Sequence, residues 1–245
     1  MQTAPDHQAA VRGIFLFELL GRDMKSTAHD ELFAYQAVIG EIQDFAWQDL
    51  TDSGFADVAW AYYYFSIQFR ENLLVARKLF PTDERLIELA KGECDTGNLS
   101  PWPGVAAAGE RMNHDEFMRR TLKLSAISAR KRPRFEAMGE GYLTAVRATD
   151  PMVRAMSLSS YEDGGLERVF RAMLRAAPSA DPGTAAFRHF LSEHVRFDSG
   201  DDGGHGALIR HLAADDRILP LWTMFRDLLV DFVPVLSRRA QGMAA

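Results

Sequence analysis

The densest group of side chains able to bind a metal ion lies late in the chain, between residues 190 and 206. His194 and Asp198 are four residues apart, a spacing that places both on one face of a helix about one turn from each other. The run from Ser199 to Gly204 combines glycine with turn-forming residues and should end that helix. His205 begins the next helical segment, which can fold back toward the first two residues. An imidazole and a carboxylate at this spacing can reach one cation, so the pattern predicts a metal site.

Two more ionisable residues stand in otherwise apolar helical surroundings. Glu162 precedes two consecutive glycines, Gly164 and Gly165, within a predicted helix. Each glycine in a helix interior costs about 1 kcal/mol relative to alanine. Either a neighbouring backbone or a ligand approaches closely there, or the helix breaks and leaves Glu162 exposed. His114 shares a helical stripe with apolar residues and is expected to face inward, as a ligand or as a core histidine bonded to a backbone carbonyl.

A glutamate is the natural companion of His114 in such a site. Glu110 lies four residues before it, in a helix predicted to start near residue 107 or 109, so both could reach one cation. Glu93 lies on the far side of a loop rich in proline and glycine and is the alternative. His189 is expected to point elsewhere, because it lies about 140° around the helix axis from His194.

Helical periodicity dominates the chain, and no segment shows the sustained alternation of a strand. Apolar spacing predicts helices over about residues 9–20, 30–50, 55–79, 84–94, 107–124, 134–148, 151–175, 183–198 and 218–239. The helix over residues 55–79 is dense in aromatic residues and is expected to be central and buried. We therefore predict an all-α fold: a single domain over residues 1–245, built as a bundle of about eight or nine helices, with 1–8 and 240–245 frayed.

Composition excludes several classes of function. The formal net charge of −6 argues against general nucleic-acid binding, which normally uses a basic surface. No apolar run approaches the ~20 residues that span a bilayer, and the N-terminus lacks the pattern of a signal peptide. The one cysteine, Cys94, excludes an internal disulfide and a cysteine-built zinc site. We expect a cytoplasmic protein without nucleic-acid or membrane partners.

The order of the candidate residues resembles the heme-oxygenase-like diiron oxidase superfamily, over about residues 105–215. The matching segments are Glu110-Arg-Met-Asn-His114, Ser160-Tyr161-Glu162, and Glu193-His194-Val-Arg-Phe-Asp198 with His205-Gly206. The resemblance implies a heme-oxygenase-like helical bundle, related to the TenA and PqqC proteins, that binds two non-heme irons. The six ligands that it implies are Glu110 (or, as the alternative, Glu93), His114, Glu162, His194, Asp198 and His205.

One departure from the family pattern concerns the second metal. Six residues separate Asp198 from His205, a longer gap than the family usually has. Without His205, a single iron held by His114, His194 and one glutamate is the alternative.

Histidines together with carboxylates suit Fe(II) or Mn(II), whereas structural zinc favours thiolates. The resemblance implies one or two Fe(II) ions, O2 as co-substrate, and oxidation of a small organic substrate such as an amino-acid or fatty-acid derivative. By the same analogy we expect a homodimer. The aromatic residues from Tyr62 to Phe69 would line the substrate pocket or simply pack in the core. Two other functions stay open: a metal-free TenA- or PqqC-like protein that binds a small molecule, and a non-catalytic helical interaction protein.

Overall fold

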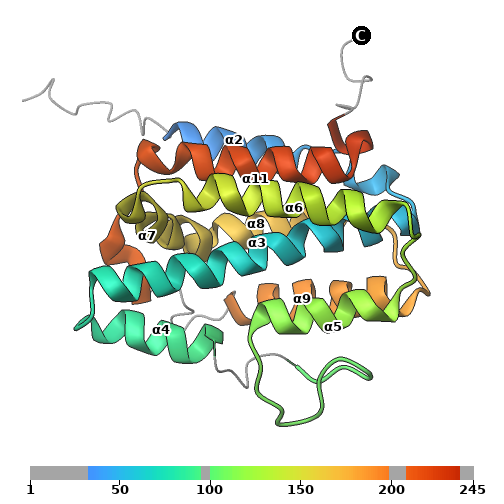
Figure 1. Ribbon diagram of the computed structural model, residues 1–245, viewed down its shortest axis with the longest axis horizontal. Helices are drawn as coiled ribbons and strands as arrows, with labels where there is room; N and C mark the ends of the chain where they lie inside the picture. The colour runs from blue at the N-terminus through green and yellow to red at the C-terminus, as the bar shows by residue number, and fades with distance from the viewer. Residues whose placement is uncertain (1–32, 95–99, 199–207, 238–245) are drawn as a thin grey trace, which may run out of the picture. The chain divides into compact units, whose positions relative to one another are not determined.

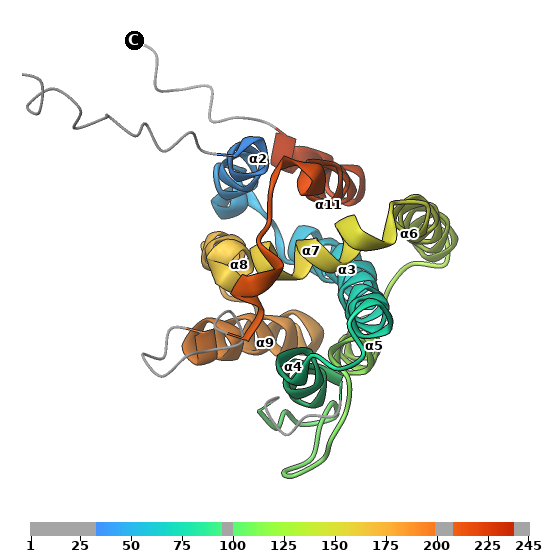
Figure 2. The same cartoon turned by 90° about the vertical axis from the view of Figure 1, so that its left-hand side faces the viewer.

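Helix α3 (Asp52–Leu79) runs through the middle of the bundle and contacts helices on several sides (Figures 1 and 2). The computed structural model describes residues 33–94, 100–198 and 208–237, all of which belong to one compact unit, Phe33–Ala245. The helix begins at a cap in which the Thr51 hydroxyl accepts a hydrogen bond from the Gly54 amide. Its apolar residues are buried along most of its length, as predicted for a central helix.

The remaining described helices are α2 (Ala34–Gln43), α4 (Glu84–Cys94), α5 (His114–Leu124), α6 (Lys131–Arg147), α7 (Pro151–Ser160), α8 (Leu166–Met173), α9 (Pro182–Asp198) and α11 (Leu219–Phe232). Most of them pack directly on α3, while α2 packs on α11 and α8, and α8 packs on α9. Short 3₁₀ turns cover Trp47–Asp49, Arg210–Leu212, Asp216–Ile218 and Pro234–Ser237. An isolated bridge pairs Trp102 with Ala106, and the described ranges contain no extended strand. The predicted all-α class is confirmed, while the helix predicted over residues 9–20 lies outside the described residues.

Three predicted boundaries are wrong, each for a local reason. The helix predicted over 30–50 ends at Gln43, where the Trp47 indole donates to the Ile42 carbonyl at 2.8 Å. The helix predicted from 134 begins at Lys131, because Pro133 lies in its first turn, where a missing N–H breaks no helical hydrogen bond. The helix predicted to reach 239 ends at Phe232, since the residue before Pro234 disfavours helical geometry.

A fourth boundary matters for the site, because α5 starts at His114 and not near residue 107. Gly109 has a φ of 76°, in the left-handed region, and Asn113 caps the helix with extended backbone. Glu110 therefore lies outside the helix, and the prediction that it shares a helical face with His114 is wrong.

The helix predicted over 151–175 is divided by a five-residue π turn, Tyr161–Gly165. Gly164 has a φ of 87°, which L side chains rarely adopt. A Cβ on Gly165 would lie 2.1 Å from the Ser160 carbonyl oxygen and 2.9 Å from the Trp222 ring. The helix breaks at the glycine pair and its backbone packs closely, but Glu162 is half-buried and not exposed. The break sets the position of Glu162.

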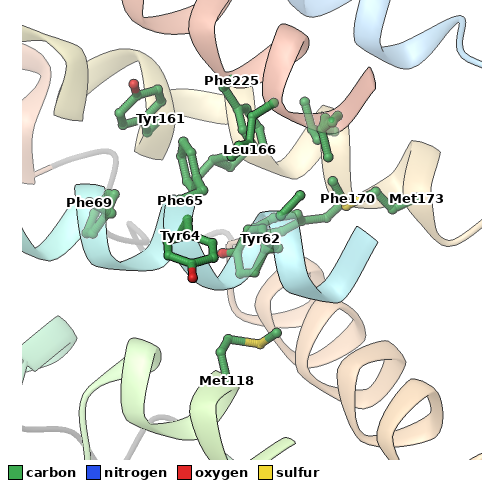
Figure 3. Packing of buried hydrophobic residues seen from close by; sticks show 14 of the residues in the cluster. Tyr62, Tyr64, Phe65, Phe69, Met118, Tyr161, Leu166, Phe170, Met173 and Phe225 are labelled. Carbon is green, nitrogen blue, oxygen red and sulfur yellow. The ribbon is translucent and has the colours of Figure 1, made fainter. Parts of the chain in front are cut away.

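Aromatic residues fill the space between α3 and its neighbours (Figure 3). The Phe65 ring centroid lies 4.1 Å from that of Phe225 and 5.1 Å from that of Tyr161, and Tyr62 meets Phe170 at 5.5 Å. Aromatic contacts of this kind add to the free energy gained from buried area. None of the helices in the described ranges is both long and apolar enough to cross a membrane.

Candidate metal centre

Glu93 and His114 form a buried pair between α4 and α5. The Nδ1 atom of His114 lies 2.8 Å from Oε2 of Glu93, and the side chains are 11% and 5% exposed. With the carboxylate as acceptor, Nδ1 carries a proton, and in the neutral tautomer Nε2 holds the lone pair. This Nε2 atom is buried and has no hydrogen-bond partner among the described residues. Metal-binding histidines are commonly oriented by such a carboxylate on the other ring nitrogen.

His194 lies beside His114 and is oriented in a similar way. Its Nδ1 atom lies 2.8 Å from the Phe190 carbonyl oxygen one turn earlier in α9. Because a carbonyl only accepts, Nδ1 is the donor, and Nε2 of the neutral ring holds the lone pair. The two imidazole centroids are 4.8 Å apart, with the rings inclined at 76°. The Phe170 and Phe190 rings surround His194, with centroids at 5.8 and 4.1 Å.

A small pocket joins these residues to Glu162, which approaches from the π turn. Its other walls are Tyr62, Ser66, Phe69, Tyr161, Leu166 and Phe170. The space open to the centre of a water molecule is about 20 Å³, room for roughly one water-sized group. Glu93, His114, Glu162 and His194 thus come from four elements and line one void. A shared void between Glu162 and the two histidines is what a metal site built from these residues requires.

Hydrogen bonds behind the pocket fix its Tyr161 wall. The Gln68 amide donates to the Tyr161 hydroxyl at 2.8 Å, and its carbonyl accepts from the Tyr142 hydroxyl. The Trp222 indole donates to Ser160 Oγ at 2.9 Å, which ties the start of the π turn to α11. Burial raises the pKa of the Tyr161 hydroxyl far above its ordinary value, so it stays protonated. Sequence reasoning missed Gln68, although a polar residue in so apolar a helix was a signal.

Glu110, the glutamate that the sequence favoured, lies elsewhere. Its carboxylate accepts from the Ala107 amide at 3.0 Å and from the Arg120 guanidinium at 2.7 Å. Its side chain is 34% exposed. The structure thus brings Glu93 to His114 in place of Glu110.

The sequence did contain a signal for Glu93. Leu86, Leu89, Ala90 and Glu93 follow the spacing of one helical stripe, and all four are buried. A carboxylate on the buried stripe of α4 needs an interior partner, whereas Glu110 precedes its helix and can remain in water.

The other predicted residues are placed only in part. Asp198 is the last residue of α9, and its side chain lies outside the described atoms, as does the whole of His205. His189 stacks on Trp102, with ring centroids 4.7 Å apart, away from the pocket as predicted. Within the described ranges, no three histidine, cysteine, aspartate or glutamate side chains are already gathered around one point as a metal site.

The donors nevertheless fit an iron or manganese ion chemically. Two imidazoles and two carboxylates are the ligand types that Fe(II) and Mn(II) take in proteins. The void holds about one water-sized group, and the buried Nε2 of His114 needs a partner there.

Comparison with known proteins finds no family model that matches the chain and no significant match among curated proteins or solved structures. The fold and pocket define an all-α protein with a histidine–carboxylate pocket. The resemblance to the heme-oxygenase-like superfamily rests on the order and spacing of residues and stays a prediction.

Proposed function

We propose that the protein is a non-heme iron oxidase or oxygenase that uses O2 to oxidise a small organic substrate, such as an amino-acid or fatty-acid derivative. One observation carries the proposal: His114 and His194, from different helices, line one buried pocket with Glu93 and Glu162. Histidine is the commonest metal ligand in proteins, and carboxylates beside it favour iron or manganese over structural zinc.

In this proposal His114, His194 and Glu162 hold the first Fe(II), or Mn(II) in its place, and Glu93 orients His114 through its Nδ1. Asp198 and His205 complete a second site if two ions bind. Iron bound by these residues would supply the reducing equivalents for O2 activation and coordination positions open to O2.

The protein prepares these ligands before any ion binds. Glu93 and the Phe190 carbonyl hold the protons on Nδ1 of the two histidines, so each ring offers Nε2 to a metal ion. The aromatic walls exclude bulk water and lower the local dielectric constant, which strengthens the attraction between the carboxylates and a cation. Tyr161 remains a neutral hydroxyl, because burial raises its pKa, and Gln68 fixes its position.

The donor atoms in the pocket weigh against the two rival functions. A metal-free protein that binds a small molecule would leave the buried Nε2 of His114 without a partner among the described residues. A non-catalytic interaction protein has no use for an inward pair of histidines and two carboxylates in one void. The cytoplasmic location and the homodimer remain parts of the proposal that rest on composition and on family analogy.

Two histidines on α9 provide the test. We expect anaerobic reconstitution of the full chain with Fe(II) to give stoichiometric iron, measured by elemental analysis after desalting, and O2 uptake on exposure to air. His194→Ala removes a ligand and should abolish both. His189→Ala is the matched control, because it removes an imidazole from the same helix outside the pocket.

The pattern across the variants decides the result. Iron retained equally by the wild type, His194→Ala and His189→Ala would come from surface binding and contradict the proposal. Absence of retained iron in the wild-type protein would overturn it directly.

A further inference from the structure

A larger hollow lies where the first turns of α3 and α6 meet the end of α5 and the start of α9. We call it the outer hollow; the lining residues that matter here are Asp52, Asp57, Trp60, Ser125, Lys131 and Asp181. The space open to the centre of a water molecule is about 420 Å³. This volume falls within the roughly 300–1,000 Å³ of small-molecule sites in proteins.

A second void, the inner hollow, continues the first toward the interior. The two share Ala56, Trp60 and Ser125 as walls, and Thr121 lines the inner one. Thr121 is 1% exposed, and its buried hydroxyl has no hydrogen-bond partner among the described residues. A buried polar group without a partner is unfavourable, so this hydroxyl points to a group that would occupy the hollow.

The charges on the lining favour a cation. Three aspartates face one lysine, an excess of two negative charges. Lys131 already forms an ion pair with Asp57, because its Nζ lies 2.6 and 2.9 Å from the two carboxylate oxygens. Asp181 Oδ1 accepts from the Ser125 hydroxyl and from the Thr184 amide, which fixes the carboxylate at the junction of the two hollows.

Apolar surface adjoins this acidic lining. Trp60 is 9% exposed and forms a wall of both hollows, and the inner hollow also includes Ala59 and Leu122. A ligand that matches these walls carries positive charge at one end and hydrocarbon on the rest. A hydrated metal ion would leave the apolar walls unused.

We propose that the two hollows together bind a small aliphatic amine, with its ammonium group at the Ser125 junction and its hydrocarbon body against Trp60. The Asp181 carboxylate and the Thr121 hydroxyl would accept hydrogen bonds from the ammonium group. This site does not involve the candidate iron ligands, so its test is independent of the proposed oxidase function.

The probe is n-butylamine, titrated into the full chain at neutral pH and constant ionic strength, with n-butanol and n-butyrate as controls. We expect a saturable change in tryptophan fluorescence and a rise in melting temperature with the amine alone. In Trp60→Phe the fluorescence response should disappear while the thermal shift remains, because Trp47, Trp102 and Trp222 lie outside the hollows.

Variants of the lining give effects of opposite sign. Thr121→Val keeps the shape but removes the acceptor, and amine affinity should fall about 3- to 10-fold. Lys131→Gln removes the lysine from the lining, and amine affinity should rise. Lys91→Gln, the same loss of one positive charge at an exposed position of α4, should leave the affinity unchanged.

Several results would overturn the proposal: equal responses to butanol or butyrate, a response that does not saturate, or unchanged amine affinity in both lining variants. Displacement of the amine by millimolar Mg²⁺ would instead assign the hollow to a metal ion. Circular dichroism checks that each variant is folded. Because amine affinity should fall in Thr121→Val and rise in Lys131→Gln, general destabilisation cannot explain both changes.

Discussion

The contact region of α3, α5 and α9 holds two voids of opposite character. The candidate metal pocket has room for about one water-sized group, whereas the outer hollow offers about 420 Å³. In the small pocket, His114 has a buried Nε2 without a partner among the described residues; in the large one, Asp57 and Lys131 pair with each other. The volume of the outer hollow suits a small molecule. The buried metal-ligand atoms of the small pocket, in surroundings of low dielectric constant, suit a metal ion.

Aromatic rings of α3, α5 and α9 pack against one another beside the candidate metal pocket. Tyr62 of α3 meets Phe187 and Phe190 of α9 at centroid distances of 5.6 and 5.5 Å, and Phe117 of α5 meets Phe190 at 5.4 Å. We call these four residues the aromatic layer. The following predictions test the packing of this layer and the residues around each void.

The largest effect is expected at the centre of the aromatic layer. Phe190 is 1% exposed, and Phe190→Ala should lower the free energy of unfolding by about 3–5 kcal/mol, because it leaves a cavity. Urea unfolding measures this loss. Phe33→Ala is the control, since Phe33 is 47% exposed and its removal should change stability by about 0.5 kcal/mol or less. A loss below about 1 kcal/mol for Phe190→Ala would mean that the layer is not well packed.

The second-largest effect is expected on iron affinity, and it distinguishes Glu93 from Glu110. Glu93→Gln weakens a ligand or orienting group of His114, and Fe(II) affinity should fall about 10- to 100-fold. Glu110→Gln is the matched control and should leave iron affinity unchanged, since Glu110 pairs with Arg120. Competition with a chromophoric chelator measures both. A larger loss of iron affinity for Glu110→Gln than for Glu93→Gln would indicate that Glu110 is the glutamate of the metal site, as the sequence favoured.

A third test probes how closely the elements pack beside the outer hollow. A Cβ on Gly183 would lie 2.0 Å from Ser125 Oγ and 3.0 Å from Ser125 Cβ. Gly183→Ala should therefore cost about 1–3 kcal/mol in unfolding free energy. Gly141→Ala on α6 meets open space and should stabilise the protein by about 0.4–1 kcal/mol. Equal effects of the two substitutions in thermal unfolding would argue against the close approach of α9 to Ser125.

The smallest expected effect concerns two carboxylates of α3 that pair with opposite ends of α6. Burial raises the pKa of Asp57 above 3.8 despite Lys131, so its contribution to stability is lost as pH rises through the raised pKa. The hydrogen bond from Arg147 lowers the pKa of Glu71 below 4.5, so its contribution is present above that pH and is lost as pH falls through the lowered pKa.

Unfolding free energies between about pH 3 and 7 check these signs. The difference between wild type and Asp57→Asn should fall as pH rises, and that between wild type and Glu71→Gln should increase. Parallel trends for the two variants would show that the outer hollow does not bury Asp57.

Much of the fold could be predicted from local pattern, and less of the site. The helical class, the central position of α3 and the inward face of His114 follow from the spacing of apolar residues. The start of α5 could not be predicted from that spacing, because Gly109 and Asn113 set it through backbone geometry. The prediction that Glu110 lies on the same helical face as His114 depended on that start, and it was wrong.

The sequence by itself determined that the chain is helical and that His114 lies on a buried stripe, because both depend on residues within one or two turns of each other. Only the tertiary structure decided that Glu93 pairs with His114 and that His194 and Glu162 share their pocket. These residues lie on different helices, and their distances depend on how the helices pack around α3. Helix packing depends on how whole helix faces fit together, and the spacing of residues along one helix does not show which faces will meet.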